Sequence, residues 1–293
     1  MTSATLRNLK RKEDLIDYAV HLHPDGYPLP AWIELSPAEL CNRQCVFCPK
    51  SDPTRYPNRP LHMLPATYRE LARELRRINY PGTVVLAGYG EPLLSPYLTG
   101  MVVCLSQVAR VELVTNGDRM ERYPDGAGVL CGIGLSMFVV NLYDGPEQEE
   151  RFHQLFRSAG VPEDHYLLRD RWYGADRDYG IKLTNRAGVV TIGNQLPVVP
   201  DKICHYPAYS MMIDWDGEVR VCAQDWHRKI SLGNINREPL LDIWTSSKAR
   251  EHRMGLAHGR RGLDPCAGCN ADGTLHGAGH AEAWARYYAR GAS

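Results

Sequence analysis

Hydrophobic and polar positions along residues 32–195 alternate in a way that predicts short buried strands separated by amphipathic helices. The predicted strands are short apolar runs at 32–35, 83–87, 111–115, 133–141 and 181–183. The predicted helices have apolar residues at helical spacing and cover 66–78, 97–108 and 147–159, after a short leading helix. Strands that alternate with helices of about 10–15 residues are typical of a parallel α/β sheet or barrel.

The pattern changes after about residue 195, where a segment with two prolines leads into a second region. There, the Asp216-Gly217 pair between two apolar runs predicts a hairpin. Further helices are predicted over 239–254 and 281–290. We therefore expect a lead-in at 1–31, a core at 32–195 and a smaller domain at 196–293.

The composition is that of an ordinary folded protein, with 44% hydrophobic and 23% charged residues. Lys+Arg and Asp+Glu both number 34, so the formal net charge is zero. This balance excludes a strong long-range attraction to nucleic acids or anionic membranes. No apolar run approaches the roughly 20 residues that span a bilayer, and no secretory signal is recognisable. We expect a cytoplasmic protein without nucleic-acid or membrane partners.

Nine cysteines are the unusual feature, and seven of them fall into two groups. The first group is Cys41-x3-Cys45-x2-Cys48, directly after the first predicted strand. Three thiolates in one loop favour an iron–sulfur cluster in which one iron remains open to another ligand. A zinc site that takes its fourth ligand from elsewhere in the chain is the alternative.

The second group is spread over the smaller domain and ends in a close pair; its members are Cys204, Cys222, Cys266 and Cys269. Four cysteines can hold a closed iron–sulfur cluster, and a structural zinc ion fits the same spacing. The two remaining cysteines, Cys104 and Cys131, lie in apolar segments, where free cysteines are commonly buried as small hydrophobic residues.

The first group resembles the signature of the radical S-adenosylmethionine (SAM) superfamily, including the aromatic Phe47 before the last cysteine. The GYGEP sequence at 88–92 resembles the GGEP motif of that superfamily, with a tyrosine in place of one glycine. The TNG sequence at 115–117 resembles a strand-end turn that often lines the SAM pocket. The resemblance covers about 32–195 and implies a partial (β/α)6 barrel.

The same resemblance implies that strand-end loops bind SAM. The implied contacts are Gly88, Tyr89, Gly90, Glu91, Thr115, Asn116, Ser136, Asn185 and Arg186. It also implies that the reduced cluster cleaves SAM, and that the resulting 5′-deoxyadenosyl radical removes a hydrogen atom from an unactivated C–H bond. An external one-electron reductant of the flavodoxin or ferredoxin type is the implied partner.

The second group resembles the SPASM/twitch extension of the superfamily. No cysteine follows Cys269, which matches the shorter, twitch-like form with one auxiliary cluster. The resemblance therefore implies two 4Fe–4S clusters, a SAM-binding cluster at the first group and an auxiliary cluster at the second.

Enzymes of this size with one auxiliary cluster resemble the tailoring enzymes of aminocyclitols and aminoglycosides. We therefore expect a small polycationic sugar or aminocyclitol as substrate, and the acidic residues at 144–150 agree with this because carboxylates bind amines. A peptide-modifying SPASM enzyme is less expected, since only about 30 residues precede the first strand. An iron–sulfur electron carrier is a third alternative, but a carrier has no need for GYGEP and TNG motifs.

Of the two tailoring reactions, we expect epimerisation of a carbon centre in an aminoglycoside, of the neomycin C to neomycin B type. An epimerase returns a hydrogen atom from a cysteine thiol, and Ala249 in the predicted helix 239–254 is a candidate position for a replaced donor cysteine. The alternative is a dehydrogenase that oxidises an aminocyclitol or sugar alcohol to a ketone, with the auxiliary cluster as electron acceptor.

Overall fold

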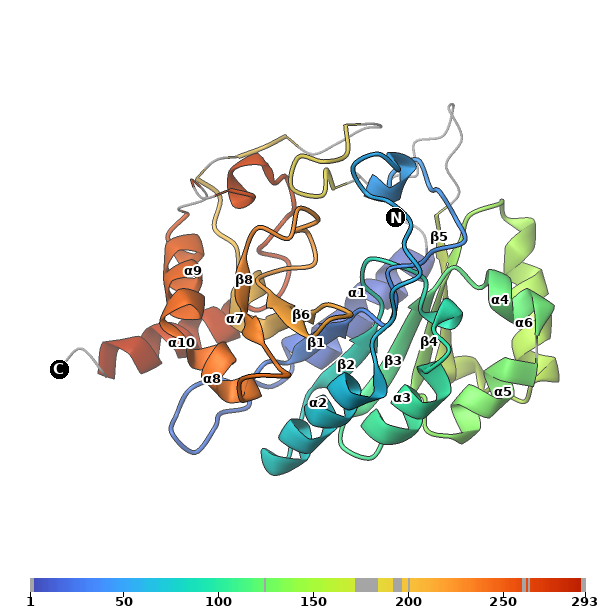
Figure 1. Ribbon diagram of the computed structural model, residues 1–293, viewed down its shortest axis with the longest axis horizontal. Helices are drawn as coiled ribbons and strands as arrows, with labels where there is room; N and C mark the ends of the chain where they lie inside the picture. The colour runs from blue at the N-terminus through green and yellow to red at the C-terminus, as the bar shows by residue number, and fades with distance from the viewer. Residues whose placement is uncertain are drawn as a thin grey trace.

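The computed structural model describes residues 3–123, 125–171, 184–191, 197–199, 201–259, 262 and 264–290. Its strands form one mixed sheet in the order β5-β4-β3-β2-β1-β6-β7-β8 (Figure 1). They are β1 (Trp32–Leu35), β2 (Thr83–Leu86), β3 (Arg110–Thr115), β4 (Met137–Leu142), β5 (Tyr166–Asp170), β6 (Ser210–Ile213), β7 (Glu218–Arg220) and β8 (Ser231–Asn234). Neighbouring strands from β5 to β6 pair in parallel, whereas β7 and β8 pair antiparallel.

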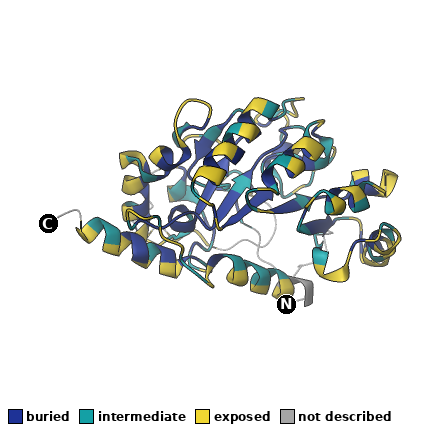
Figure 2. Ribbon diagram, turned by 90° about the horizontal axis from the view of Figure 1, so that it is seen from below, coloured by how far each residue is buried: buried dark blue, intermediate teal, exposed yellow. Residues whose placement is uncertain are grey.

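Helices connect the parallel strands and pack on one face of the sheet (Figure 1). They are α2 (Pro65–Arg77), α3 (Leu98–Leu105), α4 (Asp118–Arg122), α5 (Asp125–Gly132) and α6 (Glu147–Ser158). The main hydrophobic core lies between these helices and the strands. Figure 2 shows the result, with dark blue strands beneath helices that are yellow on their outer side. The predicted α/β class is confirmed.

Helix α1 (Ser3–Ile16) lies on the opposite, inner face of the sheet. Its last residue, Ile16, packs with Trp32 of β1 and Val85 of β2, which point away from the main core. Arg11 forms a buried ion pair with Glu112 of β3. This helix therefore supplies a wall on the side of the sheet where the strand-end loops fold inward.

Strand β6 links the two halves of the molecule. The predicted hairpin is present as β6 and β7, with Gly217 in its turn at φ +85°. Unexpectedly, β6 also pairs in parallel with β1, so the sheet continues from the core into the C-terminal region. All four residues of β6 are buried, as suits a strand with neighbours on both sides.

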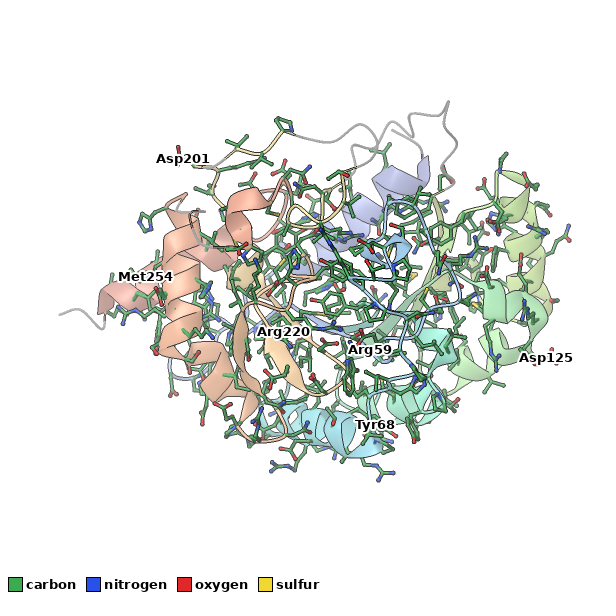
Figure 3. All side chains as sticks on the ribbon, turned by 45° about the horizontal axis from the view of Figure 1, so that its top comes forward. Arg59, Tyr68, Asp125, Asp201, Arg220 and Met254 are labelled. Atoms are coloured by element: carbon green, nitrogen blue, oxygen red, sulfur yellow. The ribbon has the colours of Figure 1, made fainter. Side chains whose placement is uncertain are left out.

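The C-terminal region packs around this extension of the sheet. Its helices are α7 (Tyr206–Tyr209), α8 (Leu240–Thr245), α9 (Ser247–Ala257) and α10 (Ala278–Arg290). Short 3₁₀ turns lie at Pro49–Ser51, Pro92–Leu94, Glu163–His165 and Cys266–Gly268. Figure 3 shows Met254 of α9 and Asp125 of α5 on opposite sides of the molecule, with side chains crowded between them.

Several elements differ from the sequence-based expectation. Strand β5 and helices α4 and α5 were not predicted, and β4 begins at Met137, after a positive-φ Gly134 (+107°). The predicted helix 239–254 is broken at Ser246, whose extended backbone ends α8 and whose side chain caps α9. The predicted strand 181–183 and the predicted domain boundary at 195 lie outside the described residues.

Within the ranges described above, no helix combines the length and the apolar character needed to cross a lipid bilayer.

Candidate active site

A cavity of about 450 Å³ lies between the inner face of the sheet and the loops that leave the carboxyl ends of its strands. All three cysteines of the first group line it, together with Cys222 of the second group. The ends of β2, β3, β4 and β5 also contribute residues, as does α1. Carboxyl ends of parallel strands are the usual place for catalytic groups, because their loops converge there.

The first cysteine group lies in a loop that the chain braces from several sides. The Cys48 amide donates to the Cys45 carbonyl at 2.9 Å. Asn58 brackets Cys41: its Oδ1 accepts from the Cys41 amide at 2.8 Å and its Nδ2 donates to the Cys41 carbonyl at 2.6 Å. Phe47 stacks on Tyr143 with ring centroids 5.9 Å apart. The loop thus holds a fixed path around the cavity.

The thiols of this loop are partly buried and suit a cationic group that binds thiolates. Burial raises the pKa of Cys41 to about 11 and that of Cys45 to about 12, so the thiolate forms require a bound cation. Among the described residues, no three His, Cys, Asp or Glu side chains converge as ligands of one metal ion do. A 4Fe–4S cluster needs sulfurs farther apart, each on a different iron.

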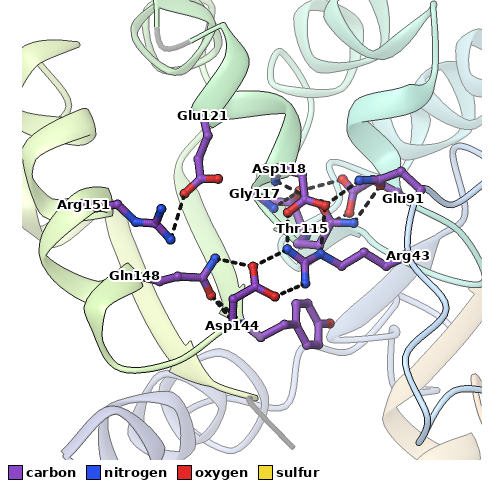
Figure 4. Close-up of polar contacts among 12 residues, drawn as sticks. Arg43, Glu91, Thr115, Gly117, Asp118, Glu121, Asp144, Gln148 and Arg151 are labelled. Carbon is purple, nitrogen blue, oxygen red and sulfur yellow. Dashed lines mark hydrogen bonds and ion pairs between the residues drawn. The ribbon is translucent and has the colours of Figure 1, made fainter.

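Arg43, inside the cysteine motif, ties the loop to the ends of β3 and β4 (Figure 4). Its guanidinium donates to both carboxylate oxygens of Asp118 at 2.8 and 2.5 Å and to both of Asp144 at 2.7 Å. Gln148 of α6 in turn donates to Asp144 at 3.0 Å. Bidentate, charge-assisted hydrogen bonds fix the orientation of the guanidinium and the carboxylates as well as the distance between them.

Glu91 of the GYGEP sequence is buried and ties β2 to β3. Its carboxylate accepts from the Thr115 hydroxyl at 2.6 Å, the Asn116 amide at 2.8 Å and the Leu93 amide at 3.0 Å. Burial raises its pKa to about 7, although these three hydrogen bonds favour the charged form. The GYGEP and TNG sequences therefore form one unit at the cavity rim.

The two glycines of GYGEP allow close contact with the start of the cysteine loop. A Cβ at Gly88 would lie 2.5 Å from the Ser36 side chain, and one at Gly90 would lie 2.3 Å from the Ala38 carbonyl oxygen. Gly88 also has φ +84°. The tyrosine between them turns away from the rim: the Tyr89 hydroxyl donates to the Asp225 carbonyl at 3.0 Å.

The second cysteine group surrounds its own small cavity. Its lining includes all four cysteines of the group: Cys204, Cys222, Cys266 and Cys269. Backbone amides of Gln224 and Ala271 donate to the sulfurs of Cys222 and Cys269, each at 3.4 Å. Three residues, Tyr206, Cys222 and Gln224, line both this cavity and the larger one. The second group therefore lies directly behind one wall of the larger cavity.

A profile of the radical SAM superfamily matches residues 35–167, and a profile of the SPASM iron–sulfur cluster-binding domain matches residues 204–270. The chain contains a radical SAM domain and a SPASM domain. The cofactors are accordingly SAM and iron–sulfur clusters, one of them auxiliary. Three partly buried cysteines at the larger cavity and four at the smaller one fit a SAM-binding cluster and an auxiliary cluster.

A related sequence and a related crystal structure each cover most of the chain. An S-adenosyl-L-methionine-dependent 2-deoxy-scyllo-inosamine dehydrogenase from Niallia circulans is 29% identical over 246 residues, 81% of this chain and 92% of that protein. The crystal structure of BtrN in complex with AdoMet and 2-DOIA has a TM-score of 0.70 at 27% identity, over 84% of this chain and 95% of that chain. An anSMEcpe structure with bound AdoMet (TM-score 0.52, 15% identity, 89% and 96% covered) shares the fold.

The Niallia circulans relative contradicts the predicted epimerase, because the reaction in its name is a dehydrogenation. The structure also gives no support to a hydrogen donor at position 249. Ala249 is buried in the first turn of α9, where its amide donates to the Ser246 hydroxyl, and it does not line the cavity. The break at Ser246 turns this helix into the C-terminal region rather than toward the cavity mouth.

The structure separates the other proposed SAM contacts of this radical SAM chain into two sets. Those that line the cavity are Gly88, Tyr89, Gly90, Glu91, Thr115, Asn116 and Arg186. Ser136 does not, because it precedes β4 and so lies at the amino end of a strand, away from the loops. Asn185 instead clasps the second cysteine group, exchanging hydrogen bonds with Asn270 and donating to the Gly268 carbonyl at 2.7 Å.

Sequence reasoning missed most of the charged residues of the cavity. Seven cationic side chains line it: Arg11, Lys12, Arg43, Lys50, Arg169, Arg171 and Arg186. The lining carboxylates are Glu34 and Glu91. This excess of positive charge does not support a polycationic substrate. An alternating Arg-x-Arg at 169–171 was the available signal, but it required recognising β5.

Proposed function

We propose that this protein is a radical SAM dehydrogenase that oxidises a secondary alcohol of a cyclitol or aminocyclitol to a ketone. The observation that supports this reaction most directly is the wall shared by the two cavities, formed by Tyr206, Cys222 and Gln224. Dehydrogenation requires a one-electron acceptor near the substrate, and the second cysteine group lies behind that wall. The related 2-deoxy-scyllo-inosamine dehydrogenase supports the same reaction.

Cys41, Cys45 and Cys48 would hold the SAM-binding cluster, and the rim formed by GYGEP and TNG would hold SAM itself. Bound there and reduced, this pair of cofactors supplies the removal of a hydrogen atom from an unactivated C–H bond. We propose an external flavodoxin- or ferredoxin-type protein as the source of the electron. The chain's own contribution is to fix the loop, which Arg43 and Asn58 do through the hydrogen bonds described above.

Oxidation of a carbinol to a ketone removes two hydrogens from the substrate. One leaves as a hydrogen atom, and the other leaves as a proton and an electron. The cluster that Cys204, Cys222, Cys266 and Cys269 would hold supplies a one-electron acceptor. The proton is released to solvent.

Anaerobic incubation with SAM, dithionite and a panel of neutral, aminated and phosphorylated cyclitols tests this function. We expect 5′-deoxyadenosine together with a ketone two hydrogens lighter than the substrate. A carbinol deuterated at the reacting carbon should pass one deuterium to 5′-deoxyadenosine. A product of unchanged mass, or no 5′-deoxyadenosine, would contradict the proposal.

The role of the second cysteine group has its own test. Cys266→Ala and Cys269→Ala should retain SAM cleavage and lose ketone formation, because the electron acceptor is removed. Cys104→Ala is the matched control, since Cys104 lies in α3 and lines neither cavity. Ketone formation at the wild-type rate in both auxiliary-site variants would show that the electron leaves by another route.

A further inference from the structure

One wall of the cavity carries cations that the described part of the chain leaves without ion pairs. They come from two elements: Lys12 from α1, and Arg169 and Arg171 from the end of β5. Within the described residues, none of the three lies in an ion pair with a carboxylate. Lys12 instead lies over the Trp32 ring at 5.3 Å, and Arg169 donates to the Asn141 side chain at 2.9 Å.

Other cations of the cavity have partners. Arg11 pairs with Glu112, and Arg43 pairs with Asp118 and Asp144. Lys50 and Arg186 act electrostatically on the thiols of the first group. Their positive charge would offset the negative charge of the thiolates that hold a cluster. The unpaired wall is therefore distinct from the cations that hold the cysteine loop.

Arg169 and Arg171 both act electrostatically on Lys12, and Arg171 acts on Arg169. Burial lowers the pKa of Lys12 to about 8 and that of Arg169 to about 9, and in each case a neighbouring arginine lowers it further. Arg171 shifts in the same direction from the same main cause. Glu34 offers one carboxylate nearby, but burial raises its pKa and weakens its charge. Unpaired buried cations are unfavourable unless a ligand supplies the opposite charge.

We infer that the substrate carries an oxyanion, a phosphate ester or a carboxylate, which Lys12, Arg169 and Arg171 bind. Arg169 in β5 and Arg171 directly after it both line the cavity, and guanidinium forks match the paired oxygens of both anions. The inference rests on the proposed function and narrows it, from any cyclitol to one with negative charge. It also replaces the polycationic substrate that the sequence led us to expect.

Binding to the reconstituted full chain in the presence of SAM tests the inference by calorimetry. Two pairs of probes distinguish the two anions: myo-inositol with myo-inositol 1-phosphate, and glucose with glucuronate. We expect the anionic member of at least one pair to bind at least tenfold more tightly than its neutral partner. Equal binding within both pairs, or tighter binding of the dication 2-deoxystreptamine, would overturn the inference.

Substitutions locate the anion site. Arg169→Gln and Arg171→Gln should each reduce the preference for the anionic probe at least fivefold, whereas Arg169→Lys should retain part of it. Arg76→Gln, on the outer side of α2, is the matched control and should leave the preference unchanged. An unchanged preference in both glutamine variants would place the anion elsewhere and overturn the assignment.

The carboxylate of SAM is the rival ligand for these cations. If they bind it, Arg169→Gln and Arg171→Gln will weaken SAM binding and suppress SAM cleavage in the absence of substrate. We expect both to stay within twofold of wild type. SAM cleavage needs no substrate, so a wild-type protein that does not cleave SAM would refute the proposed function. A wild-type protein that cleaves SAM but shows no preference for the anionic probes would refute only this inference.

Discussion

The two walls of the cavity differ in how their charges are compensated. On the wall next to the first cysteine group, Arg43 lies between Asp118 and Asp144, and Glu91 accepts three hydrogen bonds (Figure 4). On the part of the lining formed by α1 and β5, Lys12 and Arg169 have no carboxylate in an ion pair within the described chain. The first arrangement stabilises a loop, whereas the second leaves charge available for a ligand. The contrast separates residues that build the site from residues that recognise substrate.

The largest effect on activity is expected from loss of the three cysteines in the loop that Arg43 stabilises. Replacing Cys41, Cys45 and Cys48 together by alanine should abolish SAM cleavage and lower the iron content from about eight to about four per chain. Iron analysis and 5′-deoxyadenosine formation measure both effects. Cys104→Ala is the control, and retention of eight irons in the triple variant would contradict the assignment of the first cluster.

Breaking a pair on this wall should destabilise the fold. Asp118→Ala leaves the partly buried Arg43 with one carboxylate and removes three hydrogen bonds, two from Arg43 and one from Asn42, so we expect a loss of about 2–3 kcal/mol in the free energy of unfolding. Urea unfolding measures it. Glu121→Ala is the control, because the Glu121–Arg151 pair is exposed and 3.7 Å long, and it should change stability by less than about 0.5 kcal/mol.

Substitution of a cation in the part of the lining formed by α1 and β5 should raise stability instead of lowering it. Arg169→Gln removes a cation without an ion-pair partner, so the protein without substrate should become more stable by about 1 kcal/mol. That gain corresponds to a rise of about 2–4 °C in Tm. Arg76→Gln should leave Tm unchanged. A lower Tm for Arg169→Gln would mean that this arginine is a structural residue, like Arg43.

The smallest effect is a dependence on pH, because a lysine can lose its charge. The pKa of Lys12 is about 8 in the fold against an ordinary value of 10.5, so the fold disfavours its charged form. Lys12→Met should therefore be more stable than wild type below pH 8. The difference should shrink between pH 8 and 10.5, as the lysine becomes neutral first in the fold and then in the unfolded chain. Thermal unfolding from pH 7 to 10.5 measures the difference, and a constant difference would exclude titration of Lys12 as its cause.

The features that the sequence predicted correctly are local. The parallel strands with their helices follow from periodicity, and the first cysteine group has short spacings whose chemistry is specific. The predicted strand began four residues before β4, and this placed Ser136 within a strand, whereas in the structure it precedes β4 and does not line the cavity. Asn185 was assigned to SAM because its partner Asn270 lies 85 residues further along the chain.

The features that the sequence could not supply depend on distant pairings. The parallel pairing of β6 with β1 joins residues almost 180 positions apart. The charge of the cavity depends on α1 meeting β5 across the inner face, which no local pattern encodes. The preference between epimerisation and dehydrogenation was wrong because both begin with the same abstraction and use the same motifs; the related proteins, not the cysteine spacing, distinguish them.

The residue that follows α1 is held by the far end of the chain. Asp17 accepts from the Gly277 amide at 2.7 Å, and its second oxygen lies 2.7 Å from His276. During synthesis on the ribosome, these hydrogen bonds cannot form until residue 277 has emerged. By then the cysteines of both groups have been synthesised, all but Cys266 and Cys269 of them much earlier. The nascent protein therefore passes through a stage in which the end of α1 lacks its C-terminal anchor.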